Sequence, residues 1–282
     1  GISGGLRMKE LSESFSVLMS VYKGEEPSYL FDSINSIYFE QTLKPQEIVL
    51  VKDGPLTDEL YVVIQSLKDK LGDVLVLLQL EENVGLGRAL QYGLQRCTNE
   101  IVARMDSDDL SVPNRFEKQL HTLKMLNVDV CGSWVSEFFP TVDDIYSMRK
   151  VPENHNEIIS FATERSPMNH PSVMFKKSAV LKHGSYSDHV RSQDYYLWVR
   201  MIQGGALFYN IPSSLVLMRG GPQLLSRRSG LKYALNEAKI FLDFYKMGFI
   251  GLLKTLKNII IRFTVRILPE LFLKLIYKRL RT

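Results

Sequence analysis

The segment IVARMDSDD, residues 101–109, joins a short apolar run to three carboxylates, Asp106, Asp108 and Asp109. The run has the length and composition of a buried β-strand, so the acids stand where that strand ends. Like charges at this spacing repel one another, and a strand end seldom gathers them unless something positive lies between them. The segment therefore raises the question of which cation the acids hold, and what that cation binds in turn.

The residues on both sides of this segment follow a strand-then-helix pattern. Apolar strands are predicted at 15–21, 47–54, 74–80 and 100–106, and helices at 27–41, 57–70, 85–97 and 113–126. Pro27 and Pro113 suit a first helical turn, and Thr57 or Asp58 can cap the second helix. This alternation predicts an α/β fold of Rossmann-like type, a mostly parallel mixed sheet with helices on both faces.

Polar loops follow three of these strands. They are SVYKGEE (20–26), KDGP (52–55) and MDSDD (105–109). Parallel strands present their carboxyl ends at one edge of a sheet, and that edge is where such folds bind ligands. A single aspartate such as Asp53 or Asp106 often does no more than cap a helix. Three polar loops at one edge favour a binding site instead.

The second half of the chain loses the alternation. Strands of an antiparallel kind are predicted at 128–139 and 170–175, a helix at 192–205 and a last strand at 215–220. We therefore expect one domain over residues 8–225. Its first half would span 14–126 and its second half 127–225. Residues 1–7, before Met8, look like a vector-derived extension.

The remaining segment, 226–282, is apolar and basic. From Lys232 to Thr282 there are 11 Lys and Arg residues against 3 acids, a net charge of +8, whereas the rest of the chain is at −4. Its longest uncharged apolar run, MGFIGLL, has about seven residues, too few to span a bilayer. Near its end one helical face holds Leu268, Phe272, Leu275 and Ile276, and another holds Lys274, Lys278 and Arg281. This pattern predicts a helix in a membrane interface, although a helix packed on the body with its lysines in solvent fits it too.

Composition narrows the class of protein. A chain of 282 residues with 45% hydrophobic residues is long enough to bury a full core. Two cysteines, Cys97 and Cys131, argue against a disulfide framework and favour a reducing, cytosolic location. The first residues contain no apolar stretch typical of a secretory signal.

The acids after the fourth predicted strand suit a hard cation. Mg²⁺ or Mn²⁺ prefers oxygen ligands and keeps positions open for phosphate oxygens, and the chain contains no His and Cys cluster at zinc spacing. The predicted ligand is therefore a diphosphate compound. A dinucleotide motif is incomplete, because Leu90 stands where GLGRAL needs its third glycine, and a P-loop is absent. The acidic first loop, with Glu25 and Glu26, disfavours a triphosphate and leaves a nucleoside diphosphate sugar as the best fit.

Several of these segments together resemble a known family. FSVLMSVYKGE, EIVLVKDGP, NVGLGRALQYGL and IVARMDSDD, followed by NHPSVMF and SQDYYLW, are similar to inverting family 2 glycosyltransferases of GT-A fold. The resemblance covers residues 14–220 and is strongest to bacterial enzymes of O-antigen and exopolysaccharide synthesis, including amylovoran-type transferases. It implies a GT-A fold with a helical tail, and the transfer of a sugar from a UDP-sugar to a lipid-linked oligosaccharide.

The resemblance also assigns roles to residues by position. Ser20 and Tyr22 would line the nucleotide pocket, and Asp53 would accept a hydrogen bond from uracil N3–H. The segment with Asn83, Gly85 and Arg88 would close over the donor. Asp106 would contact the ribose side and Asp108 would bind Mn²⁺ or Mg²⁺. Asp109 would orient its neighbours or the donor sugar.

The general base is expected outside the acidic segment. Asp194 in SQDYYLW matches the second position of the family's Glu-Asp pair, whereas Gln193 replaces the first acid and cannot ionise. Asp194 would therefore remove the acceptor hydroxyl proton. A helix-capping Asp194 is the plain alternative, and Asp188 is the substitute base.

Three further residues keep two interpretations each. His170 could be a metal, phosphate or acceptor contact, or an ordinary strand histidine. Arg227 and Arg228 could close over the diphosphate or could begin the basic membrane face. The Gln-x-x-Arg-Trp signature of processive enzymes is missing, so we expect addition of a single sugar.

The expected partners follow from these assignments. They are a UDP-sugar, a polyprenyl-diphosphate-linked glycan and an anionic membrane surface, at the inner face of a bacterial cytoplasmic membrane, with no nucleic acid. Two rival functions fit parts of the sequence. A sugar nucleotidyltransferase fits the sheet edge, and a non-enzymatic basic peripheral membrane protein fits the tail.

Overall fold

The computed structural model describes residues 14–187, 192–221 and 230–279. The chain divides into two compact units. The first contains residues up to 159 together with 166–219, and the second contains 160–165 and the residues after 219. The expected domain boundary after residue 225 falls outside the described residues, as does the extension expected at 1–7.

A parallel half-sheet forms the first part of the first unit. Its strands are β1 (Phe15–Val21), β2 (Glu47–Lys52), β3 (Leu75–Gln79) and β4 (Ile101–Arg104). They lie in the order β3-β2-β1-β4, and each neighbouring pair is parallel. All four strands lie where the apolar runs predicted them. Their carboxyl ends therefore meet at one edge, as the sequence required.

The sheet continues beyond β4 with strands of mixed direction. They are β8 (Met174–Lys176), β6 (Val130–Phe138), β9 (Phe208–Arg219) and the short β5 (Leu110–Ser111), with β7 (Ile145–Arg149) beside β6. β8 is antiparallel to both β4 and β6, whereas β6 and β9 are parallel. Within the described residues this mixed extension makes one nine-stranded sheet, and the mixed α/β sheet predicted from the strand–helix alternation is confirmed.

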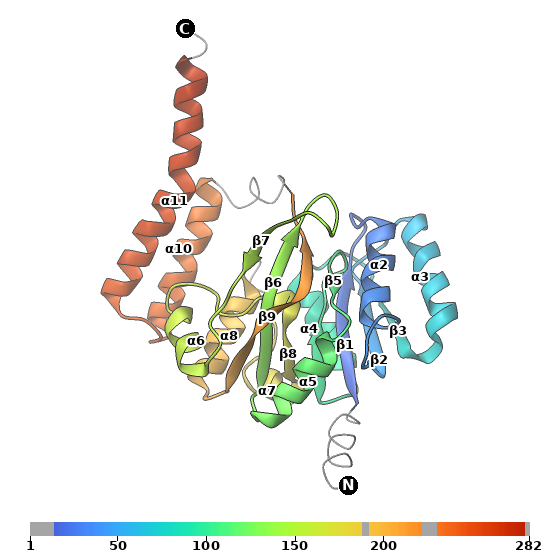
Figure 1. Ribbon diagram of the computed structural model, residues 1–282. Helices are drawn as coiled ribbons and strands as arrows, with labels where there is room; N and C mark the ends of the chain where they lie inside the picture. The colour runs from blue at the N-terminus through green and yellow to red at the C-terminus, as the bar shows by residue number, and fades with distance from the viewer. Residues whose placement is uncertain (1–13, 188–191, 222–229, 280–282) are drawn as a thin grey trace. The chain divides into compact units, whose positions relative to one another are not determined.

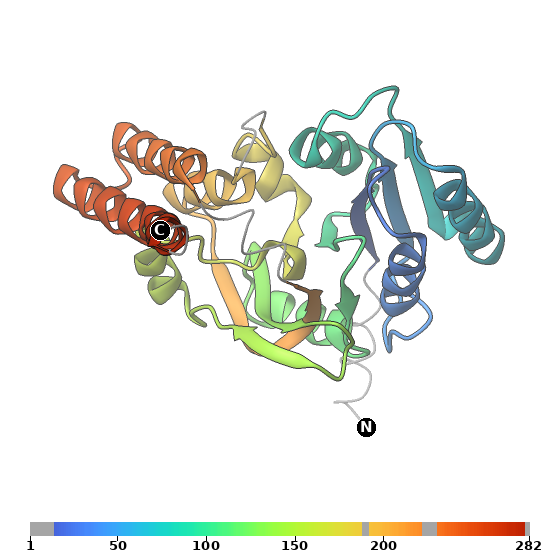
Figure 2. The ribbon, with the colours of Figure 1, turned by 90° about the horizontal axis from the view of Figure 1, so that it is seen from above.

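Helices cover both faces of the sheet (Figures 1 and 2). One face packs against α2 (Pro27–Ile37), α3 (Asp58–Leu71) and α5 (Arg115–Met125), and the other against α4 (Leu86–Arg96), α7 (Lys177–Lys182) and α8 (Gln193–Gln203). Alternate residues of one strand serve the two faces: Val17 and Met19 belong to the first core and Leu18 to the second. Burial on both faces is what the continuous apolar strands predicted.

The structure corrects some predicted boundaries and adds small elements. Residues 170–172 form a 3₁₀ turn, η2 (His170–Ser172), so the strand expected at 170–175 begins only at Met174. Pro171 lies in that turn and has no N–H to donate to a strand ladder. The additional elements are β5, β7, α6 (His155–Ala162), α7 and the 3₁₀ turn η1 (Gly72–Val74).

The second unit contains two long helices, α10 (Leu231–Lys246) and α11 (Leu252–Arg279). They pack against each other, and a turn with Gly248 at φ 75° joins them. Phe244 packs edge-to-face against Phe241 and Phe249. The end of α6 and the residues after it, up to 165, also belong to this unit. None of the helices in the described residues has the length and apolar composition needed to cross a membrane.

Candidate active site

The loops after β1, β2 and β4 meet at the carboxyl edge of the parallel strands. Ser20 pairs in register with Val51 one strand over, and the backbone N–H of Asp53 donates to the carbonyl of Val21 at 2.8 Å. The backbone N–H of Met105, directly before the acids, donates to the carbonyl of Leu18 at 3.2 Å. The structure therefore brings together the three loops that the sequence placed at one edge.

Asp53 holds the loop that follows β3. Its Oδ1 accepts a hydrogen bond from the backbone N–H of Val84 at 2.8 Å, and the side chain is 4% exposed. Burial raises the pKa of Asp53, and bonds from the Val84 and Gly85 N–H groups act in the opposite direction. A Cβ on Gly54 would lie 2.6 Å from the backbone nitrogen of Asn83, so only glycine lets these two loops approach so closely.

The same loop leads into α4. Gly85, at φ 88°, stands before the first helical residue, and its N–H donates to Asn83 Oδ1 at 3.2 Å. Asn83 and Arg88 have exposed side chains on either side of this helix start. Asp53 therefore anchors the loop that leads into α4. This loop and the first turn of α4 contain the three residues predicted to close over the donor, Asn83, Gly85 and Arg88.

The loop after β1 faces the acidic segment. The Tyr22 ring lies over Gly24, where an added Cβ would be 2.5 Å from it, and Tyr22 is 47% exposed. Ser107 donates a hydrogen bond from its hydroxyl to Glu25. An accessible aromatic ring and a carboxylate thus border the acids from the β1 side.

Asp108 and Asp109 lie in a strongly negative environment. The pKa of Asp108 is raised to about 6, chiefly by burial and then by the charges of Asp106 and Glu25. Asp109 is 1% exposed, and its pKa rises well above the usual range through burial and the charges of Asp106 and Asp108. Its Oδ1 accepts from the backbone N–H of Arg219 at 3.0 Å, whereas Oδ2 has no partner among the described residues.

This chemistry fits a divalent cation. The mutual repulsion that raises the pKa of Asp108 would disappear beside Mn²⁺ or Mg²⁺, and oxygen donors are the ligands that both ions prefer. Within the described residues, no group of three or more His, Cys, Asp or Glu side chains could hold a metal ion. A cation at Asp108 would therefore need oxygens from a ligand, as expected for a site that binds a diphosphate.

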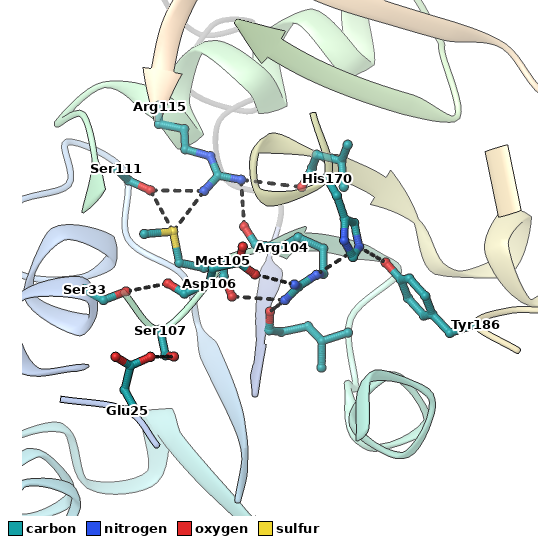
Figure 3. A network of polar contacts seen from close by, with 12 residues as sticks. Glu25, Ser33, Arg104, Met105, Asp106, Ser107, Ser111, Arg115, His170 and Tyr186 are labelled. Atoms are coloured by element: carbon teal, nitrogen blue, oxygen red, sulfur yellow. Dashed lines mark hydrogen bonds and ion pairs between the residues drawn. The ribbon is translucent and has the colours of Figure 1, made fainter. Parts of the chain in front are cut away.

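Arg104 connects Asp106 of the acidic segment to His170 in η2 (Figure 3). Its side chain is completely buried, and Nη2 forms an ion pair with Asp106 Oδ1 at 2.8 Å. Nη1 donates to the carbonyls of Leu18 and Met105, and Nε donates to His170 Nε2 at 3.3 Å. All three guanidinium nitrogens are occupied, which keeps the charge fixed in the core.

His170 is explained by this network. Its Nε2 accepts from Arg104, which always donates, and lies 3.0 Å from the hydroxyl of the buried Tyr186. Burial and the charge of Arg104 hold the pKa of His170 well below its usual range, so the ring is neutral. The nitrogen that could bind a metal is used by Arg104, and these contacts favour a structural His170.

Asp194 lies in the first turn of α8, near the same network. The pKa of Asp194 is raised to about 6. Burial is the largest cause and the charge of Asp106 adds to it, whereas backbone N–H groups and the charge of Arg104 lower the pKa. Ser192 precedes the helix in a left-handed conformation at φ 58° and makes no side-chain cap. The predicted base and the predicted donor contact Asp106 therefore interact electrostatically, although 88 residues separate them in the chain.

Three candidate residues, Asp188, Arg227 and Arg228, lie outside the described residues. Three others were missed by the sequence interpretation: Arg104, Tyr186 and Arg219. A signal existed for Arg104, because an arginine inside the buried run IVAR requires a partner. Arg219 had none, because its contacts to Tyr29 (3.6 Å from the ring centroid) and to the carbonyl of Asp108 (3.2 Å) join distant segments.

Comparison with known proteins decides the family. The family model for glycosyl transferase family 2 matches residues 16–189, which include β1, the acidic loop and η2. The chain belongs to glycosyl transferase family 2. It is therefore a glycosyltransferase, and the family named by its motifs is confirmed. Neither a nucleotidyltransferase nor a non-enzymatic membrane protein is consistent with this membership.

Curated relatives and solved structures agree with this family. The UDP-Gal:α-D-GlcNAc-diphosphoundecaprenol β-1,3-galactosyltransferase of Escherichia coli is 38% identical over 96% of this chain and 98% of its own length. The amylovoran biosynthesis glycosyltransferase AmsE of Erwinia amylovora is 35% identical over 94% and 98%. Residues 1–349 of S. aureus TarS, solved in complex with UDP-GlcNAc, match at 16% identity with a TM-score of 0.65, over 89% of this chain and 73% of that one. The last comparison confirms the predicted GT-A fold of this glycosyltransferase.

Proposed function

We propose that this glycosyltransferase moves one sugar from a UDP-sugar to a lipid-linked diphosphate glycan, with inversion at the anomeric carbon. The relative of 38% identity is named for a UDP-galactose donor and a diphosphoundecaprenol-linked acceptor, and it aligns over 96% of the chain. Alignment of this extent includes the tail as well as the catalytic unit. UDP-galactose is therefore the first donor to test.

The observation that supports the proposal best is that Asp194, in the first turn of α8, lies close to the strand-end acids. Its carboxyl group is near enough to Asp106 and Arg104 for both charges to act on its pKa. An inverting transfer needs a base on the side of the anomeric carbon opposite the leaving diphosphate. A carboxylate this close to the strand-end acids would be within reach of an acceptor hydroxyl that attacks a donor bound at those acids.

The transfer itself is a single displacement. Asp194 takes the proton from the acceptor hydroxyl as that oxygen forms its bond to the anomeric carbon. The bond between the anomeric carbon and the diphosphate oxygen breaks, its electron pair leaves with UDP, and the configuration inverts. With a pKa of about 6, Asp194 is ionised at neutral pH and ready to accept the proton.

Donor binding is assigned to the residues at the sheet edge. Ser20 and Tyr22 would line the nucleotide pocket. Asp53 would use the oxygen that Val84 does not occupy to accept from uracil. Asn83, Gly85 and Arg88 would close over the donor from the start of α4, and Asp106 would contact the ribose side.

A divalent cation completes the donor site. Asp108 would hold Mn²⁺ or Mg²⁺, which offsets the charge of the leaving diphosphate when it is bound. Asp109, buried and bonded to the backbone of Arg219, keeps the loop that presents Asp108 in place. This assigns different tasks to the two neighbouring acids.

The second unit would hold the enzyme at a membrane surface. The buried residues of α11 are polar: Thr255 is 0% and Asn258 5% exposed, Asn258 donates to the carbonyl of Thr163 at 2.8 Å, and the partly buried Arg266 pairs with Glu237 at 3.1 Å. Many apolar side chains of α11 are exposed instead, among them Leu253 at 84%, Ile260 at 65% and Phe272 at 67%. A helix arranged in this way exposes to water the side that a lipid interface would cover.

The exposed apolar side chains of α11 lie within a segment of net charge +8. A basic segment is attracted to the anionic lipids of a bilayer, so we take a membrane surface as its partner. A membrane surface is also where a polyprenyl-linked acceptor is found. We therefore place the protein on the inner face of the bacterial cytoplasmic membrane, bound peripherally through α10 and α11.

A transfer assay tests the catalytic part of this proposal. The purified full chain is given radiolabelled UDP-galactose, Mn²⁺ and a GlcNAc-diphosphate lipid, and lipid-bound label is measured. Label should appear in the lipid fraction, and EDTA or Asp108→Asn should abolish it. Transfer that is unchanged in EDTA would refute the role of the cation. No transfer from any of a panel of UDP-sugars would refute the donor class.

A further inference from the structure

The amide of Gln193 occupies the space above Gly87. A Cβ built on Gly87 would lie 1.1 Å from Gln193 Oε1 and 1.9 Å from its Cδ. The clash involves the whole amide, so it does not depend on which way the amide is turned. Gln193 is the first residue of α8, and Gly87 lies in the first turn of α4. Two helices that cover the same face of the sheet therefore touch at this pair.

The contact is not explained by the stability of the fold. Gln193 Oε1 is buried and has no hydrogen-bond partner among the described residues, which is unfavourable for folding. Ser192, the residue before it, is held in a left-handed conformation that non-glycine residues seldom adopt. Unfavourable features that persist in one small region are typical of functional sites.

The first turn of α4 contains residues assigned to the donor, and the first turn of α8 contains the proposed base. The donor residues are Gly85 and Arg88, and the base Asp194 directly follows Gln193. A shift of α8 relative to α4 would change the distance between the base and the donor sugar. The Gln193 amide lies directly over the backbone of α4 at Gly87, where the two helices meet.

We propose that Gln193 is a positioning residue, and that its contact with Gly87 fixes the distance between the base Asp194 and the donor-binding turn of α4. This inference rests on the proposed function, because it takes Asp194 as the base. The role needs the length and volume of the side chain and no charge.

Gly87→Ala tests the contact without removing any functional group. Gly87 has ordinary helical backbone angles, so alanine suits the helix and should not lower its stability. The new methyl group must displace Gln193, because their atoms cannot lie 1.1 Å apart. We expect kcat for galactose transfer to fall about 10- to 100-fold, the loss typical of a misplaced catalytic group, with KM for UDP-galactose changed less than about threefold.

The double variant Gly87→Ala, Gln193→Ala provides the rescue. Its two methyl groups fit where the amide lay, so kcat should recover at least about fivefold relative to Gly87→Ala. Matched controls are Gln95→Ala, an exposed glutamine on α4, and Gly251→Ala, which has open space around it; both should transfer like the native chain. Melting temperatures show whether each variant is folded.

The outcomes separate this inference from the proposed function. If the native chain transfers no galactose or other sugar from UDP, the proposed function fails first. If the native chain is active and Asp194→Asn is not, but folded Gly87→Ala transfers within twofold of native, the positioning role of Gln193 is wrong. A double variant no faster than Gly87→Ala would also overturn it.

Discussion

At the scale of single residues, the site is built from charges that the fold holds in unfavourable surroundings. Asp109 is buried with one carboxylate oxygen unpaired, Asp108 is surrounded by other acids, and Arg104 is buried in a core strand. Each arrangement opposes folding unless a ligand or an ion pair compensates it. Within the described residues, Arg104 pairs with Asp106 and the backbone N–H of Arg219 donates to one oxygen of Asp109, so a cation would compensate the charge of Asp108.

The pKa of Asp194 predicts how activity depends on pH. Its value of about 6 is above that of an ordinary aspartate, so the base becomes protonated and inactive as the pH falls below about 6. We expect kcat at saturating UDP-galactose and Mn²⁺ to be level near pH 7.5 and to fall about tenfold per pH unit below 6. UDP binding measured at each pH serves as the control, and a kcat that stays level down to pH 5 with UDP bound would contradict the assignment.

The same shift makes a prediction about stability. The carboxyl pKa is raised in the folded state, so ionisation disfavours folding, and this loss develops as the pH rises from about 4 to 6. Asp194→Asn removes the ionisation. We expect this variant to unfold at a higher urea concentration than native at pH 7, with the difference vanishing near pH 4. Equal or lower stability at pH 7 would show that Asp194 is not in a desolvated position.

At the scale of elements, the candidate donor-binding residues lie in the loops that follow β1, β2 and β4. β1, β2 and β4 could be predicted because each is a continuous apolar run that only a strand buried on both faces explains. β5 and β7 could not, because a two-residue strand and an exposed strand have no apolar pattern of their own. The acids and Asp194 were found from their motifs. The Arg104–His170–Tyr186 network was missed, because it joins positions that only tertiary packing brings together.

Removal of Arg104 should destabilise the packing of β4 against His170 in η2 and Tyr186. Arg104→Met leaves Asp106 without its ion pair and the carbonyls of Leu18 and Met105 without a donor. Because Asp106 is partly exposed, we expect a loss of about 2–3 kcal/mol in the free energy of unfolding, from urea denaturation. Arg96→Met, at an exposed position on α4, is the matched control and should change it by less than about 0.5 kcal/mol. A loss for Arg104→Met no larger than that of the control would contradict the network.

At the scale of the whole molecule, the two units have opposite character. The first buries its apolar residues on both faces of a sheet and gathers acids at one edge. The second turns apolar side chains of α11 outward within a basic segment. Composition alone indicated this division. It could not show which polar residues of α11 pack inward, because that depends on contacts with the residues after α6.

Membrane binding should therefore depend on three outward residues. In the variant Leu253→Asn, Ile260→Asn, Phe272→Asn, we expect at least tenfold weaker cosedimentation with phosphatidylglycerol-containing vesicles, because about 1.5 kcal/mol or more of apolar burial is lost at each side chain. Val62→Asn, 69% exposed on α3 of the first unit, is the control and should bind like native. Equal vesicle binding by the triple variant would refute the membrane face. A native dimer that this variant converts to monomers would assign α11 to a second copy of the chain.

The central claim is that Asp194 removes the acceptor proton at a donor site built by the strand-end acids. The most direct measurement compares native and Asp194→Asn in single-turnover transfer from UDP-galactose to the GlcNAc-diphosphate lipid, with UDP affinity measured alongside. We predict a rate lower by at least about 1,000-fold, within the range for loss of a general base, with UDP affinity unchanged within threefold. An Asp194→Asn rate above one tenth of native, with UDP still bound, would contradict the account.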